Sequence, residues 1–357
     1  MPNPASLRRL STAARRIAGV FTPPRRIAGA LAAALMAQTA QAAAQAAAQV
    51  AAAPPAAVRA TEGSVAAPGV TLHYYERGQG EPVLVLSGGP GFSSDYMTPV
   101  AQELASGFRT VLLDQRGTGR STLEKLDAST LTLQLAVEDL EILRRHLGLG
   151  RWTVLGHSWG GMLGMAYAVA HPESVKALIL VCSGGPTVEF FAPFGANIEA
   201  RLLSGDHEAL DFWRDPAQRQ ADPRRAAYES LRARTPAYFF SRKNAWPFIA
   251  LLRPEGYTSA VNRLLIADLE KNAYDLRPGL RKLQLPALVV AARQDPVPES
   301  VALEIHGLLR GSRLRIVERS GHFPWLEQPK DLYDAVREFL AAVASVPASP
   351  GTPRPPS

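Results

Sequence analysis

Cysteine is almost absent from this chain, since Cys182 is the only one in 357 residues. One thiol cannot form an intrachain disulfide, and Cys182 has no second cysteine with which to build a structural zinc site. No two histidines stand at metal-ligand spacing either, so we predict a protein without a metal. Hydrophobic residues make up 46% of the chain and charged residues 20%, which indicates a globular protein rather than a disordered or collagen-like one.

The chain also has little net charge once its N-terminus is set aside. The formal charge is +7, but residues 1–59 contain seven arginines and no lysine, aspartate or glutamate. The remainder therefore carries 32 basic and 32 acidic groups. Because a neutral folded part is not attracted to a phosphate backbone, we predict that the protein does not bind nucleic acid.

A hydrophobic run of membrane-spanning length is missing from the N-terminal region. Ile27–Ala37 has eleven apolar residues, whereas a transmembrane helix needs about 20, so we predict no stable membrane span. The run follows two arginines and precedes Ala40-Gln41-Ala42, which has the form of a signal-peptidase site. We predict an export signal over residues 1–42 and a periplasmic or secreted protein. The alternatives are an alanine-rich leader on a cytoplasmic protein and a mitochondrial-type presequence.

Composition divides the rest of the chain into segments. Residues 43–62 are rich in alanine, glutamine and proline and predict a linker, and residues 344–357, with five prolines, predict a disordered tail. Between them, residues 63–185 and 286–343 predict the two parts of one core.

Continuous apolar runs recur along both core parts, and such runs suit strands covered on both faces. They alternate with segments of helical period, which predicts a parallel sheet with right-handed crossovers. The expected strands are Val70–Gly78, Glu81–Ser87, Arg109–Asp114, Trp152–Gly156, Val175–Val181, Pro286–Ala292 and, more weakly, Ser312–Val317. The expected helices include Leu133–Leu147, Met162–Ala170 and Glu327–Ala342.

The alternation breaks between residues 186 and 285. This block holds 13 of the 26 aromatic residues and no strand-like apolar run. We predict a helical cap whose apolar underside covers a pocket, although aromatic crowding also occurs in plain packing.

The segment Gly156-His157-Ser158-Trp159-Gly160 follows one expected strand and precedes an apolar helix. A nucleophile raised on a sharp strand-to-helix turn needs little side-chain bulk two residues before and two residues after it. The N-terminus of the helix also favours developing negative charge. We therefore predict that Ser158 is a nucleophile; the alternative is an ordinary serine at a helix cap.

A serine hydroxyl needs a base that a third group orients. Asp295 follows the strand expected at Pro286–Ala292, and His322 comes 27 residues later, after the last expected strand. Both lie at carboxyl ends of strands, where parallel sheets build their sites, so we predict Asp295 and His322 as the other two members of a triad. His157 is expected to point away, and the other five histidines are expected to be solvated or on helix surfaces.

Ser87-Gly88-Gly89-Pro90-Gly91 directly follows another expected strand. Glycines in such a loop let the backbone approach a substrate carbonyl, although a simple turn would use the same residues. We predict that the N–H groups of Gly89 and Trp159 form an oxyanion hole.

Taken together, these motifs resemble a known family. SGGPG, the segment Asp114–Ser121 (DQRGTGRS), GHSWGG and SGHFPWLEQP look like the α/β-hydrolase fold and, within it, the prolyl aminopeptidases, also named proline iminopeptidases. The resemblance covers roughly Val70–Leu340. It implies a mostly parallel central sheet flanked by helices, with an inserted helical cap. It also implies a serine exopeptidase without a cofactor, which removes the N-terminal residue, preferentially proline, from short peptides.

The sequence departs from that family in two places. Ser87 replaces the usual histidine of the first motif, and the cap segment that commonly supplies a glutamate followed by Asn-His-Tyr is not recognisable. An aminopeptidase has to bind a free ammonium group, and a buried cation needs a carboxylate partner. The possible partners are Glu189, Glu199, Glu229 and Glu255.

Two other functions fit the same motifs. One is an esterase, lactonase or amidase of this fold, acting on a small amide or ester with the same triad. The other is a ligand-binding protein of this fold without hydrolytic activity. The motifs leave the number of subunits open.

Overall fold

The structure, a computed structural model, describes residues 59–251 and 256–345. The predicted signal peptide (1–42) and nearly all of the predicted linker and tail lie outside these described residues. Within the described part, no helix is both long enough and apolar enough to cross a membrane.

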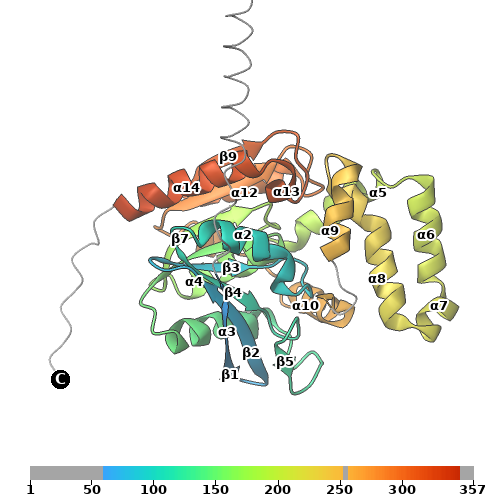
Figure 1. The fold of residues 1–357 in the computed structure, drawn as a ribbon, viewed down its shortest axis with the longest axis horizontal. Coiled ribbons are helices and arrows are strands. Elements are labelled where there is room, and N and C mark those ends of the chain that lie inside the picture. Colours follow the sequence, from blue (N-terminus) through green and yellow to red (C-terminus); the bar gives the residue numbers. More distant parts are fainter. Residues whose placement is uncertain (1–58, 252–255, 346–357) are drawn as a thin grey trace, which may run out of the picture. The chain divides into compact units, whose positions relative to one another are not determined.

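One sheet organises the described residues, in the order β1-β2-β4-β3-β6-β7-β8-β9 with β5 beside β2 (Figure 1). The pairs from β4 through β9 are parallel, whereas β1, β2 and β5 pair antiparallel. The predicted mostly parallel sheet is therefore confirmed. The strands are β1 (Thr61–Ala67), β2 (Val70–Arg77), β3 (Pro82–Leu86), β4 (Arg109–Asp114), β5 (Thr122–Leu123), β6 (Trp152–His157), β7 (Val175–Val181), β8 (Ala287–Ala292) and β9 (Arg313–Val317).

Two segment boundaries differ from those expected. β1 begins at Thr61, inside the segment predicted as a linker (43–62), and α14 (Pro329–Ser345) continues into the segment predicted as a tail (344–357). β1 pairs with β2 along its whole length, although it has no fully buried side chain. Backbone hydrogen bonds hold such an edge strand, and they leave no hydrophobic pattern in the sequence.

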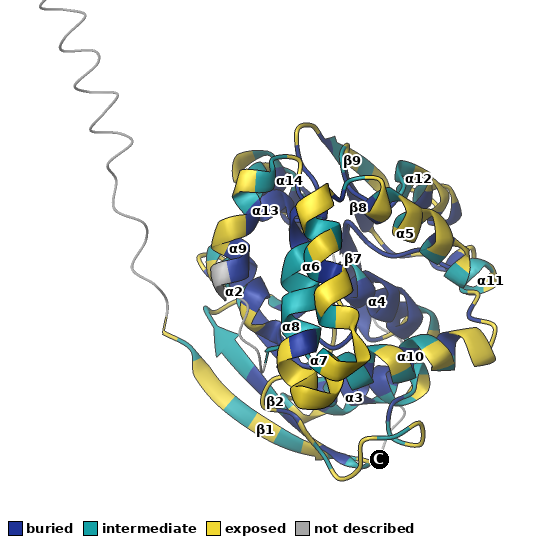
Figure 2. Ribbon diagram, turned by 90° about the vertical axis from the view of Figure 1, so that its right-hand side faces the viewer, coloured by how far each residue is buried: buried dark blue, intermediate teal, exposed yellow. Residues whose placement is uncertain are grey.

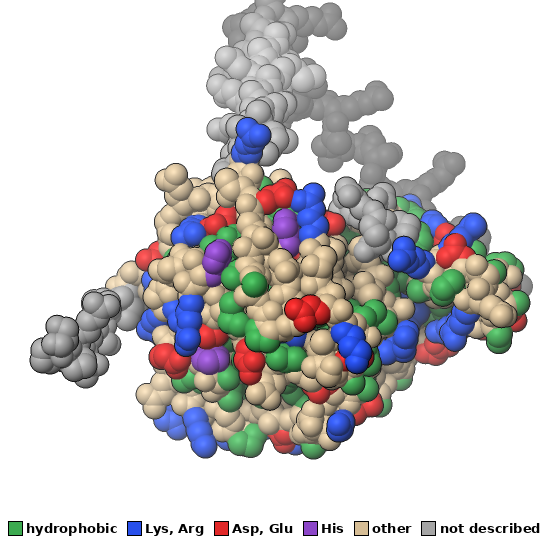
Figure 3. Space-filling model, turned by 90° about the horizontal axis from the view of Figure 1, so that it is seen from below, with side chains coloured by type: hydrophobic (Ala, Val, Ile, Leu, Met, Phe, Trp, Pro, Cys, Tyr) green, Lys and Arg blue, Asp and Glu red, His purple; other side chains and the backbone are tan. Residues whose placement is uncertain are grey.

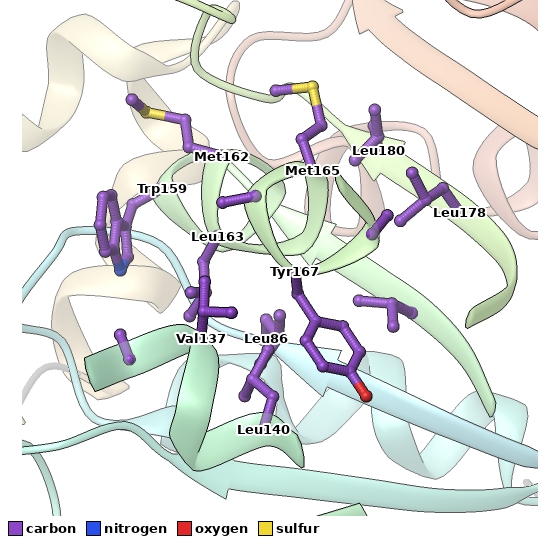
Figure 4. Close-up of a cluster of buried hydrophobic side chains, with 14 of the residues drawn as sticks. Leu86, Val137, Leu140, Trp159, Met162, Leu163, Met165, Tyr167, Leu178 and Leu180 are labelled. Carbon is purple, nitrogen blue, oxygen red and sulfur yellow. The ribbon is translucent and has the colours of Figure 1, made fainter. Parts of the chain in front are cut away.

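Helices cover both faces of the sheet. α3 (Leu133–His146), α4 (Trp159–Ala170) and α12 (Glu299–Leu308) pack on one face, and α2 (Thr98–Leu104) and α14 pack on the other. Figure 4 shows the first layer, where side chains of α4 such as Leu163 and Tyr167 lie against α3 and the strands. The central strands β3, β4, β6, β7 and β8 are buried on both sides, which explains why they read as continuous apolar runs.

The chain leaves the sheet between β7 and β8 and forms helical elements there. α5 to α9 lie to one side of the sheet in Figure 1, and Figure 2 shows the exposed outer surfaces of α6 and α7. A small cluster of Ile198, Leu202, Leu210 and Ala237 packs among these elements. We call the elements from η2 to α11 the cap. They are η2 (Val188–Phe190), α5 (Phe191–Glu199), α6 (Ser204–Arg214), α7 (Pro216–Ala221), α8 (Pro223–Arg234), η3 (Thr235–Tyr238), η4 (Arg242–Asn244), α9 (Ala245–Leu251), α10 (Ser259–Lys271) and α11 (Arg277–Leu280).

A buried ion pair anchors the turn that follows β4. Arg116 donates through Nε to Asp139 Oδ2 (2.7 Å) and through Nη2 to Asp139 Oδ1 (2.6 Å), and both side chains are almost fully buried. At the end of β4, Asp114 accepts hydrogen bonds from the backbone and hydroxyl of Ser94 in η1 (Ser94–Met97). These contacts fix the position of Gln115, which lies between Asp114 and Arg116 in the sequence.

Charged side chains of both signs are interspersed on the face shown in Figure 3. Elsewhere on the surface, Arg277 pairs with Asp275 at 2.7 Å. The expectation that the protein does not bind nucleic acid stays a prediction.

Candidate active site

Ser158 occupies the sharp turn between β6 and α4. Its backbone has φ 55° and ψ −118°, a conformation that a residue with a side chain rarely adopts and that the surroundings have to enforce. A Cβ atom on Gly156 would overlap the carbonyl of Gly160, and one on Gly160 would overlap the carbonyl of Leu86 in β3. The contact between the backbones, expected from the motif, therefore requires glycine at both positions.

The structure brings His322 and Asp295 together. Nδ1 of the His322 ring lies 2.9 and 3.0 Å from the two carboxylate oxygens of Asp295, and both residues are buried. Asp295 is itself held by the backbone N–H of Val297, which donates to Oδ1 at 2.8 Å. Because a carboxylate can only accept, Nδ1 carries the proton, and Nε2 of the neutral ring is left as a base.

Ser158 and His322 line the same cavity, which has a volume of about 90 Å³. Within the described chain, no hydrogen bond joins the Ser158 hydroxyl to the His322 ring. Catalytic hydrogen bonds of this kind are often long in proteins without a bound substrate and shorten in the complex. The cavity is otherwise mainly apolar and aromatic, with side chains that include Phe190, Phe191, Phe194, Tyr238, Phe248 and Phe323.

The two expected oxyanion donors also border this cavity. Gly89 and Trp159 both line it, and neither backbone N–H has a protein acceptor in the described part of the chain. Gly88 packs directly against the turn at Ser158, because a Cβ atom on Gly88 would lie 2.8 Å from Ser158 Cβ. The loop of residues 87–91 can therefore lie this close to Ser158, where a substrate carbonyl would bind, only with glycine at position 88.

Gln115 links the two donor segments, a role that the sequence did not indicate. Its amide nitrogen donates to the Ser87 carbonyl at 2.8 Å, and its amide oxygen accepts from the indole N–H of Trp159 at 2.7 Å. One side chain from the turn after β4 thus holds the loop of residues 87–91 beside the start of α4; we call this segment the oxyanion loop, after its predicted role. Gln115 is part of the motif DQRGTGRS, but only the fold shows what it contacts.

His157 does not point away from the site, so that expectation was wrong. Its Nε2 lies 2.9 Å from the backbone carbonyl of His322, and its Nδ1 lies 2.8 Å from the hydroxyl of Tyr96. The same hydroxyl accepts the N–H of Gly88. Since a carbonyl only accepts, Nε2 carries the proton and Tyr96 donates to Nδ1. His157 is buried in this network because successive side chains of β6 point to opposite faces of the sheet.

Cys182 is a free, buried cysteine and lies beside the His322–Asp295 pair. Potential ligand atoms of these three buried residues lie within 4.8 Å of one another. Burial first, and then the nearby Asp295 carboxylate, raise the pKa of the Cys182 thiol well above its usual value. That the protein holds no metal stays a prediction.

Three of the four glutamates considered as ammonium partners, Glu189, Glu199 and Glu229, do not line the cavity. Glu189 and Glu199 are mostly exposed, with ion-pair distances of 3.6 Å to Arg277 and 3.5 Å to His207. Glu229 pairs with Arg232 on α8. Glu255 lies outside the described residues.

Comparisons with known proteins bear on the family and the fold of the chain. The sequence model of a family described as alpha/beta hydrolase fold matches residues 81–329. The chain is 30% identical to the proline iminopeptidase of Saccharolobus solfataricus, over 81% of this chain and 95% of that protein. It is 28% identical to the proline iminopeptidase of Heyndrickxia coagulans, over 79% and 99%.

Solved structures show the same fold. A proline iminopeptidase-related protein from Thermus thermophilus superimposes with a TM-score of 0.64 at 25% identity, covering 80% of this chain and 98% of that chain. A meta-cleavage product hydrolase superimposes with a TM-score of 0.63 at 20% identity, covering 78% and 98%.

The His157 network predicts a pH dependence of stability. Burial first, and then the neighbouring His322 ring, hold the pKa of His157 well below 6.5 in the folded protein. Below pH 6.5 the unfolded chain therefore binds a proton that the folded protein does not, and the free energy of unfolding falls by up to about 1.4 kcal/mol per pH unit. We expect urea unfolding at pH 7.5, 6.5 and 5.5 to show that the free energy of unfolding falls less steeply with decreasing pH in His157→Gln than in the unmodified protein.

The control is His146→Gln, which removes an exposed imidazole on α3. It should leave the slope as in the unmodified protein. Equal slopes for His157→Gln and the unmodified protein would contradict the assignment of a buried, neutral His157.

Proposed function

The chain belongs to the alpha/beta hydrolase fold family, and we propose that it is a serine hydrolase of the prolyl aminopeptidase type. Ser158 attacks the substrate carbonyl while His322 takes the hydroxyl proton, and His322 then gives this proton to the leaving amine. Asp295 holds the imidazole in the tautomer that this transfer needs. The N–H groups of Gly89 and Trp159 stabilise the oxyanion. Water, deprotonated by His322, then attacks the acyl group, and His322 returns the proton to the Ser158 oxygen as the acyl–oxygen bond breaks.

One observation supports this mechanism above all others. The His322–Asp295 pair borders the same cavity as a serine held in a left-handed turn at a helix N-terminus. A buried carboxylate on Nδ1 makes Nε2 available as a base, and the turn raises the serine above the sheet edge.

The substrate proposal is the N-terminal residue, preferentially proline, of short peptides. It is supported by the relatives, which are proline iminopeptidases at 28–30% identity over most of both chains. It is also supported by the cavity, whose modest volume and aromatic lining suit a small apolar ring such as pyrrolidine.

Of the four glutamates that the sequence offers as ammonium partners, we propose Glu255, since the other three pair with surface cations or face solvent. The described residues that follow it contact the oxyanion loop. Gly256 accepts the backbone N–H of Ser93 at 2.8 Å, and the ring of Tyr257 packs 4.8 Å from that of Phe92, which lines the cavity.

A second function, an esterase, lactonase or amidase of the same fold, is favoured by one observation. Within the described residues, the cavity lining contains no aspartate or glutamate. Such a pocket binds an uncharged acyl group without the cost of an unpaired cation.

Three substrates separate these proposals. We expect turnover of proline 4-nitroanilide, and we expect blocking of its imino nitrogen to reduce kcat/KM by at least about 10-fold, because hydrogen bonds to a charged group contribute about 1.5–3 kcal/mol. A short 4-nitrophenyl ester serves as the third substrate. Ser158→Ala should abolish all three activities and labelling by a fluorophosphonate.

An unchanged rate with the blocked amide would overturn the aminopeptidase proposal and leave the ester or amide hydrolase. The absence of fluorophosphonate labelling and of all three activities would favour the ligand-binding alternative.

Glu255→Gln tests the ammonium partner. If the carboxylate pairs with the substrate cation, its loss should raise KM for proline 4-nitroanilide by about 10- to 100-fold and leave hydrolysis of the ester unchanged. The matched control is Glu199→Gln, which neutralises an exposed glutamate of the cap. Equal KM values for the two variants would contradict the role of Glu255.

A further inference from the structure

Glu327, the last residue of α13 (Pro324–Glu327), lies where the loop of His322 meets the cap. Its Oε2 accepts hydrogen bonds from the backbone N–H groups of Gly321 (2.6 Å) and Phe240 (3.0 Å). Its Oε1 accepts from the backbone N–H of Ser241 (3.0 Å) and from the amide of Asn244 (2.9 Å). One carboxylate therefore joins the residue before His322 to three residues of the cap region.

The backbone of His322 is bound to the cap directly as well. Its N–H donates to the carbonyl of Tyr238 in η3 at 2.7 Å. The two segments lie so close that a Cβ atom on Gly321 would overlap the same carbonyl. Tyr238 also lines the cavity. The same segment of the cap, η3, therefore forms part of the pocket wall and holds the backbone of His322.

The cap also contacts the loop of Asp295 through a charged side chain. Here the side chain is a cation that donates to backbone carbonyls, rather than an anion that accepts from backbone N–H groups. Arg201, which follows α5, donates through Nη1 to the carbonyl of Gln294 at 2.6 Å. Asn197 on α5 donates to the carbonyl of Pro296 at 2.9 Å. The backbone on both sides of Asp295 is thus hydrogen-bonded to the cap.

We infer that the cap positions the His322–Asp295 pair, with Glu327 and Arg201 as the positioning residues. The inference rests on the proposed function. It gives the cap a second role beyond covering the pocket, which is to hold His322 and Asp295 in place. The loops of the two residues follow different strands, β8 and β9, and each is tied to the cap by a charged side chain. Hydrogen bonds to charged groups are roughly twice as strong as neutral ones, so the cap restricts how far the two loops can move relative to each other.

This role makes a specific kinetic prediction. A small misplacement of a catalytic group reduces the rate of the chemical step by up to about 10²-fold without removing any contact to the substrate. Loss of Glu327 should therefore lower kcat more than it raises KM. A residue that only stabilises the fold would lower the fraction of active protein and leave kcat per active site unchanged.

The test compares Glu327→Gln with the unmodified full-length protein, with active sites counted by complete fluorophosphonate labelling. Glutamine keeps the size of the side chain, but its NH2 group must face two of the four N–H donors. We expect kcat per labelled site to fall by about 10- to 100-fold, with KM changed by less than about 3-fold. The matched control is Glu338→Gln on α14, where the glutamate is 80% exposed and lies 3.5 Å from Arg313; this variant should behave as the unmodified protein.

Arg201→Gln provides an independent arm if Glu327→Gln does not fold, and the same change in kcat is expected from it. An unchanged kcat per labelled site in the folded variants would overturn the inference, while labelling of the unmodified protein would still support the proposed function. If the unmodified protein is not labelled, the proposed function fails, and the inference fails with it.

Discussion

The left-handed backbone at Ser158 is the constraint on which the rest of the site depends. It exists because β6, β3 and the first turn of α4 touch at Gly156 and Gly160, where a Cβ atom would overlap a carbonyl. The contact raises the serine above the carboxyl edge of the sheet, between the loops that follow β3, β8 and β9. Gly156 and Gly160 thus fix the position of Ser158, around which the loops after β3, β8 and β9 are arranged.

Hydrogen bonds between loops then set the distances around this serine. Gln115 connects the oxyanion loop to Trp159, and Tyr96 connects the same loop to His157. His157 in turn holds the carbonyl of His322. These side chains come from separate parts of the chain, so the site is a product of the sheet order rather than of any one motif. In a buried network of this kind, each missing partner leaves a polar group without compensation.

Much of this arrangement could be predicted from the sequence. The apolar runs located the strands because a sheet covered on both faces excludes polar residues, and the chain order after them led to Ser158, Asp295 and His322. Gln115, Tyr96 and Glu327 could not be found in that way, since the role of each depends on at least one partner 28 to 87 residues distant. The orientation of His157 was predicted wrongly, because the alternation of side chains along β6 places it under the site. β1 was missed because edge strands leave little hydrophobic pattern.

The central claim is that Ser158 carries the acyl group between two half-reactions. The most direct measurement is the mass of the protein stopped by acid during turnover of a slowly deacylated 4-nitrophenyl ester, followed by peptide mapping. The account predicts a burst of one nitrophenol per enzyme and an increase in mass equal to one acyl group in place of a hydrogen, on the peptide that contains Ser158. An acyl group on another residue, or steady turnover with no covalent adduct under conditions where deacylation is slow, would contradict it.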